Sequence, residues 1–97
     1  MLVAFALTPL GAGDSVSPLI AQAVRIVRDS GLPTSTDAMF TTIEGEWDEV
    51  MPVIKAATEA VAASVPRVSL VLRADIRPGS TGAMRQKLES LERELQK

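Results

Sequence analysis

Residues 34–45, TSTDAMFTTIEG, decide how the chain divides into helices and strands. This segment is rich in β-branched residues, and it is too short and too polar for a packed helix. It therefore predicts two short strands joined by a tight connection. Segments with helical periodicity flank it on both sides, so the paired strands separate two helices.

The residues before this segment predict a helix over residues 18–30. Ser17 is a candidate N-cap, and Pro18 is favoured at the first helical position. Gly31 followed by Pro33 is a stop signal. The apolar positions that recur at helical spacing are Ile20, Ala23, Val24 and Val27.

The residues after the segment predict a second helix. Asp48 and Glu49 occupy its first turn, where the helix dipole favours anions. Pro52 lies about one turn inside, so the helix either kinks there or begins later. The apolar stripe consists of Trp47, Val50, Met51, Ile54, Ala57 and Val61.

Two longer strands complete the pattern. Residues 2–8 and 67–77 alternate with a period of two, and turn chemistry follows the first of them from Pro9. Met84, Leu88, Leu91 and Leu95 then mark a third, amphipathic helix. The order βαββαβ, with the added helix, predicts an α+β protein: a ferredoxin-like plait with a four-stranded antiparallel sheet, forming a single domain over residues 1–97.

One face of this sheet has no obvious cover, because the first two helices pack on the other face. The uncovered positions are Leu2, Ala4, Ala6, Ser69 and Val71. Either the leucine side of the last helix or a second copy of the chain would shield them from water. We expect a homo-oligomer, and covering within one chain is the alternative.

The amino-acid composition excludes several kinds of catalytic and metal site. The 97 residues include no cysteine, histidine or tyrosine, which excludes disulfides, thiolate and imidazole metal ligands, and Ser-His-Asp triads. The net charge of −2 gives no general reason to bind nucleic acid. The apolar N-terminus stops at Thr8 and lacks a basic region, so we expect neither a signal peptide nor a membrane span. The expected protein is cytoplasmic and has no metal and no cofactor.

Hydroxyl groups gather on the strands and are candidates to line a small polar site, although strand propensity alone would also explain them. They belong to Thr8, Thr36, Thr41, Thr42 and Ser69. Glu44 and Asp75 could bind an amino-bearing ligand or form salt bridges. Phe40 either packs in the core or lies against a flat ring.

Three segments, in this order and spacing over nearly the whole chain, carry a resemblance to a known family. They are TPLG at residues 8–11 followed by SVS at 15–17, MFTTIEG at 39–45, and RV at 67–68 with RADIR at 73–77. The chain resembles the small single-domain thiamine-binding proteins. That resemblance implies a ferredoxin-like fold, dimers that assemble into tetramers, and non-enzymatic binding of thiamine or its hydroxymethylpyrimidine half.

The resemblance also implies ligand-binding residues and no catalytic ones. Thr41 and Glu44 match one family segment, and Ser15 and Ser17 match the serine-rich loop that follows Pro-Leu-Gly in the family. Thr8 and Phe40 complete the predicted site, and Phe40 stands where the family has glycine. Two other functions stay open: a protein-assembly or regulatory module that uses the open sheet face, and a small dimeric enzyme of this fold that uses a carboxylate.

Overall fold

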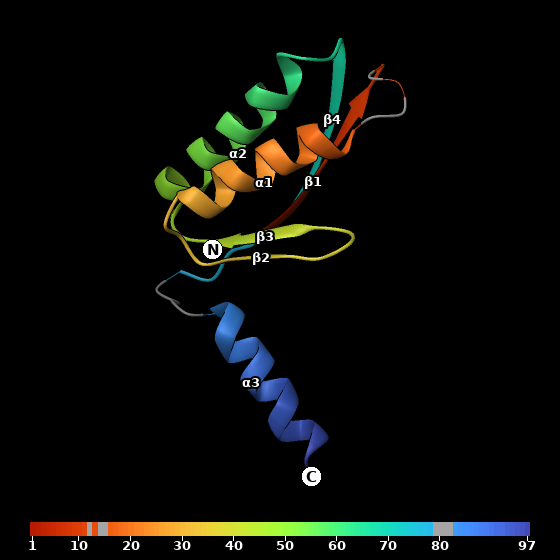
Figure 1. Cartoon of the computed structure of the whole chain (residues 1–97). Coiled ribbons are helices and arrows are strands. Elements are labelled where there is room, and N and C mark those ends of the chain that lie inside the picture. Colours follow the sequence, from red (N-terminus) through yellow and green to blue (C-terminus); the bar gives the residue numbers. More distant parts are fainter. Residues whose placement is uncertain (12, 14–15, 79–82) are drawn as a thin grey trace.

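The computed structural model describes residues 1–11, 13, 16–78 and 83–97 (Figure 1). The elements are β1 (Leu2–Leu10), α1 (Ser17–Asp29), β2 (Thr34–Thr36), β3 (Thr41–Glu44), α2 (Trp47–Ala62), β4 (Arg67–Asp75) and α3 (Ala83–Leu95). This order confirms the predicted ferredoxin-like plait with an added C-terminal helix. The paired short strands also lie where the sequence places them.

The four strands form one antiparallel sheet in the order β2-β3-β1-β4. In the central strand, Val3 lies opposite Ile43 on one side and Ala74 on the other. Phe5 similarly lies between Thr41 and Leu72. Directly opposed residues point to the same face of a sheet. All of these side chains therefore share one face.

Helices α1 and α2 pack together over that face, as Figure 1 shows. Burying an aliphatic side chain fully stabilises a fold by about 1.5–3 kcal/mol. The largest fully buried side chains are Val3, Val27, Ile43, Val50, Ile54 and Val61. The prediction that both helices cover the same face is confirmed, and the core lies between them and the sheet.

Strand β1 is longer than predicted. The sequence indicates a turn from Pro9, but the strand continues to Leu10, and Pro9 is buried opposite Val68. The pairing with β3 reaches only to Phe5, so one flank of β1 is unpaired beyond it. A proline can occupy such a flank without removing a ladder hydrogen bond. Gly11, at φ 81°, follows the strand.

The helix boundaries also refine the predictions. Val16, not Ser17, is the N-cap of α1, and its carbonyl accepts hydrogen bonds from the N–H groups of Leu19 and Ile20. The prediction of a serine cap is wrong by one residue, because Ser17 is already helical. Gly31, at φ 80°, confirms the stop signal.

Helix α2 begins at Trp47 and continues through Pro52, so the alternative of a later start is wrong. The Glu49 carboxylate accepts a hydrogen bond from the backbone N–H of Glu46 at 3.0 Å, as in a capping box. The donor that proline lacks would have bonded to the carbonyl of Asp48. That carbonyl belongs to an exposed residue of the first turn, where water can replace the bond.

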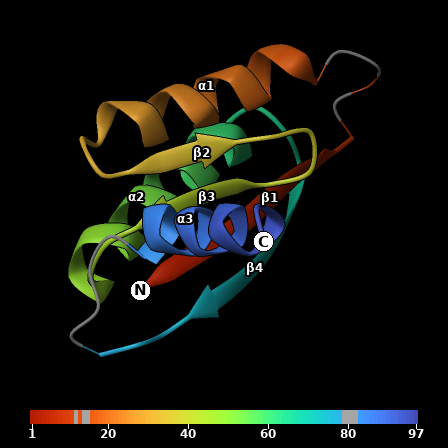
Figure 2. The same ribbon diagram turned by 90° about the horizontal axis from the view of Figure 1, so that it is seen from below.

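Helix α3 projects away from the sheet (Figures 1 and 2). The radius of gyration is 14.9 Å, whereas a compact chain of this length has about 12.5 Å. Leu88, Leu91 and Leu95 are 61%, 54% and 68% exposed. The alternative in which these leucines cover the sheet of their own chain does not occur in this structure.

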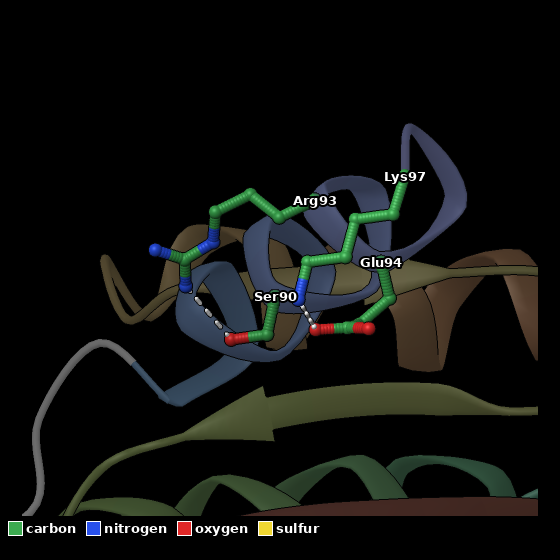
Figure 3. A network of polar contacts seen from close by, with 4 residues as sticks. All are labelled: Ser90, Arg93, Glu94 and Lys97. Carbon is green, nitrogen blue, oxygen red and sulfur yellow. Dashed lines mark hydrogen bonds and ion pairs between the residues drawn. The ribbon is translucent and has the colours of Figure 1, made fainter.

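Two polar contacts near the C-terminus join residues that are close in the sequence. Figure 3 shows the Arg93 guanidinium donating to the Ser90 hydroxyl at 3.1 Å and Lys97 paired with Glu94 at 2.9 Å. Such local pairs contribute about 0.2–0.5 kcal/mol each and do not fix the helix to the sheet. Within the described part of the chain, no helix has both the length and the apolar character needed to cross a bilayer.

Candidate functional site

A cavity of about 240 Å³ lies between α1 and the β2–β3 hairpin, on the helix-covered side of the sheet. We call it the hairpin pocket. Phe5 and Thr41 line it from the strands, Ile20 and Val24 from α1, and Phe40 from the hairpin. A water molecule takes up about 30 Å³ of liquid, so this volume corresponds to about eight waters. Drug-sized ligands occupy pockets of about 300–1,000 Å³, so the cavity suits a single substituted ring.

Two hydroxyl groups provide polar contacts in this pocket. Thr36 and Thr41 face each other across the β2–β3 pair, and their Oγ1 atoms are 3.4 Å apart. Hydroxyl hydrogen bonds usually measure about 2.5–3.0 Å, so this contact is weak. Thr41 is only 8% exposed. Both hydroxyls therefore keep the capacity to bond to a molecule in the pocket.

A carboxylate is fixed at the rim. Asp37 Oδ1 accepts hydrogen bonds from the backbone N–H groups of Met39, at 2.8 Å, and Phe40, at 2.9 Å. The backbone N–H of Asp37 donates in return to the Phe40 carbonyl at 3.0 Å. The Phe40 N–H, followed by the Met39 N–H, lowers the pKa of Asp37 below its usual 3.8. The group is therefore an oriented, ionised acceptor at neutral pH.

Aromatic and apolar side chains form the remaining walls. Phe5 is 4% exposed and belongs to the core, whereas Phe40 is 39% exposed and Met39 is 74% exposed. Phe40 lies outside the buried core cluster. Of its two sequence interpretations, core packing is therefore wrong, and the ring lines the mouth of the pocket instead.

The other predicted site residues lie elsewhere. Glu44 is 6% exposed and lies opposite Leu2, on the sheet face away from Thr41. Thr8 is exposed on that same outer face, and Ser17 is exposed at the start of α1. Ser15 lies outside the described residues. Of the five predicted residues that the structure describes, only Thr41 and Phe40 lie together in the hairpin pocket.

A second hollow of about 300 Å³ lies beside the start of α3, at the ends of β1 and β4. Lys87 forms an ion pair there with Asp75. The hydrogen bond from Lys87 and then its charge lower the pKa of Asp75, and Arg73 and Arg77 contribute less. The carboxylate of this larger hollow is already paired within the protein. The hairpin pocket is the better candidate because its polar groups have capacity left for a ligand.

The sequence indicates Thr36 only as one of several strand hydroxyls that could line a polar site, and it does not single out Asp37. A usable signal exists, because an aspartate between two runs of β-branched residues is typical of a turn closed by its own side chain. In the described ranges, no three acidic side chains gather where they could hold a metal ion.

Comparison with known proteins gives consistent results. The profile of a family described as thiamine-binding protein matches residues 3–92. A UPF0045 protein of Mycobacterium bovis is 58% identical over 96 residues, which cover 98% of this chain and 94% of the relative. A UPF0045 protein of Synechocystis is 36% identical, covering 95% and 77% of the two chains.

Two solved structures share the fold. A hypothetical protein of Methanocaldococcus jannaschii superimposes with a TM-score of 0.84 at 31% identity, covering 94% of both chains. A Thermotoga maritima protein, provisionally assigned to thiamine biosynthesis or salvage, superimposes with a TM-score of 0.79. Its identity of 20% over 92% of this chain and 96% of its own supports the fold alone.

Proposed function

Because the chain belongs to the thiamine-binding protein family, we propose that it binds thiamine, or the hydroxymethylpyrimidine half of thiamine, in the hairpin pocket. The observation that carries the proposal is the combination of a 240 Å³ cavity, aromatic walls and hydroxyls with bonding capacity. A pyrimidine is a flat ring edged with hydrogen-bonding groups, and this combination suits such a ring.

The pocket size favours the pyrimidine half as the group that enters. At about eight water volumes the cavity takes one substituted ring. The thiazolium ring of intact thiamine would then lie toward the mouth, beside the exposed Met39 and Phe40. Thr36 and Thr41 can each donate to or accept from ring nitrogens, because a hydroxyl does both.

We propose binding without reaction. General-base catalysis at neutral pH works best with a pKa near the working pH. The pKa of the pocket carboxylate, Asp37, is lowered, which makes it a weak base. Asp75, a candidate acid or base of the alternative enzyme, is paired with Lys87 on the other side of the sheet. The ligand should therefore be recovered chemically unchanged after incubation.

We further propose a homo-oligomer, a dimer or a tetramer, that forms through the open sheet face and α3. Val71 on that face is 59% exposed, and the leucines of α3 are exposed as well. Apolar groups gathered on one side of a protein mark contact surfaces. The same observation supports the second candidate function, an assembly module, which would form the oligomer but bind no pyrimidine.

Calorimetric titration with hydroxymethylpyrimidine and with thiamine tests the proposal. Thr41→Val removes the pocket hydroxyl while conserving shape, and Thr42→Val makes the same change on the opposite face of β3. A hydrogen bond contributes about 0.5–1.5 kcal/mol net, so Thr41→Val should weaken binding by about twofold to tenfold. Thr42→Val should leave the affinity unchanged. Wild-type protein that binds neither compound would refute the proposed function.

A further inference from the structure

We propose, on the basis of the proposed function, that Asp37 makes the hairpin pocket selective for pyrimidines that carry an exocyclic amino group. The corresponding compounds, in which an oxo group replaces the amino group, would bind more weakly. The proposal adds a specificity-determining residue that the sequence does not point to. It rests on the position of the carboxylate at the rim and on the use of its two oxygen atoms.

One oxygen of Asp37 holds the hairpin turn and the other is available. The backbone N–H groups of Met39 and Phe40 both donate to Oδ1. Among the residues that the structure describes, none donates a hydrogen bond to Oδ2. The turn therefore fixes the carboxylate of Asp37, a residue that lines the cavity, and leaves Oδ2 without a donor from the described residues.

Among the described side chains that line the pocket, the carboxylate of Asp37 distinguishes donors from acceptors. The Thr36 and Thr41 hydroxyls either donate or accept, so they tolerate an amino or an oxo substituent. An ionised carboxylate only accepts. Asp37 therefore gains a charge-assisted hydrogen bond from an amino group and repels the lone pairs of an oxo group. The aromatic walls contact the ring faces of both compounds alike.

The expected selectivity follows from the strength of such bonds. Hydrogen bonds to charged groups change affinity by about tenfold to a hundredfold. Asp37 is exposed, so we expect the lower part of this range. The wild-type protein should bind the amino compound about tenfold more tightly than the oxo compound.

Asp37→Asn is the decisive variant. The asparagine Oδ1 can still accept from the Met39 and Phe40 N–H groups, so the turn is kept, and an NH₂ donor replaces Oδ2. Calorimetric titration at neutral pH with hydroxymethylpyrimidine and its oxo counterpart should show the preference abolished or reversed. Asp48→Asn removes the same charge from the exposed first turn of α2 and should leave the preference intact.

The outcomes separate this inference from the proposed function. Wild-type protein that binds both compounds equally, or an Asp37→Asn variant with the wild-type preference, would overturn the role of Asp37 and leave the function standing. Binding of neither compound would overturn both. If Asp37→Asn does not fold, Asp37→Ser keeps one oxygen for the turn. It should then bind both compounds with similar affinity, and a retained tenfold preference would overturn the proposal.

Discussion

Both faces of the sheet carry apolar side chains, but these side chains are buried on one face and exposed on the other. On the helix-covered face, Phe5 and Ile43 are 4% and 0% exposed, and they belong to the core. On the outer face Val71 is 59% exposed, although its pair with Ala6 is next to the pair that contains Phe5 in the ladder between β1 and β4. The difference comes from α1 and α2, because both helices pack on one side only.

This difference separates two roles. The covered face supplies both the core and the hairpin pocket, so its stability and its binding depend on contacts within one chain. The outer face and α3 carry apolar groups that no described element of the same chain shields. Stability should therefore respond mainly to changes on the covered face, and assembly to changes on the outer face.

The largest expected effect is on stability. Ile54→Ala removes a side chain that is 1% exposed and leaves a cavity, so it should lower the free energy of unfolding by about 2–5 kcal/mol. Val71→Ala, on the outer face, should change it by about 0.5 kcal/mol or less when measured on the monomer. Urea unfolding followed by circular dichroism measures both. Equal losses would contradict the contrast between the faces.

A smaller effect is expected on assembly. If a partner chain buries the leucines of α3, replacing Leu88 and Leu91 with serine should raise the dissociation constant of the oligomer at least about tenfold. Light scattering over a range of concentrations measures the mass. The far-ultraviolet circular dichroism should stay unchanged, because both side chains are exposed within the chain. A wild-type protein that is monomeric at high concentration would contradict the proposed oligomer.

The aromatic wall of the pocket gives a comparable test of binding. Phe40→Leu keeps an apolar side chain but removes the ring, and ring contacts contribute about 0.5–1.5 kcal/mol. The affinity for hydroxymethylpyrimidine should fall about twofold to tenfold, measured by calorimetry. Tighter binding by the leucine variant would show that Phe40 obstructs the pocket instead of lining it.

The smallest effects concern two carboxylates, one at the pocket and one on the outer face. The pKa values of Asp37 and Asp75 are both lowered from 3.8. Their contributions to stability are therefore fully present above about pH 3.8 and are lost as the pH falls through each lowered pKa. Carbon NMR of the carboxyl groups measures both titrations.

Added salt should change the pKa values of these two carboxylates to different extents. Backbone N–H groups lower the pKa of Asp37, whereas the bond and the charge of Lys87 lower that of Asp75. Raising salt from about 0.1 M to about 1 M screens exposed charges, so it should return Asp75 further toward 3.8 than Asp37. Lys87→Gln should raise the pKa of Asp75 alone. Equal responses of the two carboxylates would contradict these causes.

The sequence predicts the covered face better than the pocket. Alternation and helical spacing identify the strands and helices because each depends on a local periodicity. The predicted turn at Pro9 is wrong because a strand accepts a proline where its neighbour has stopped pairing. Where β3 stops pairing with β1 is a long-range property that the local sequence does not contain. Glu44 follows Thr41 by three residues, so strand alternation alone places the two side chains on opposite faces, in agreement with the observed register.

The pocket depends on contacts between segments that are distant in the sequence. Asp37 lies at the rim because a turn folds back against α1, and no short-range pattern places these two elements together. Phe40 cannot be assigned to the core or to the pocket from periodicity, because it lies in the connection before β3. Thr41 and Phe40 both belong to the family segment at residues 39–45, and both line the cavity.

Amide NMR during titration with hydroxymethylpyrimidine tests the central claim most directly, because it reports on both faces at once. The account predicts that the signals of residues 36–41, Phe5 and Ile20 shift with a common saturation curve. The signals of residues 69–71 in β4, the edge strand on the other side of β1 from the hairpin, should not shift. Shifts confined to β4 and α3, or no shifts at all, would contradict binding in the hairpin pocket.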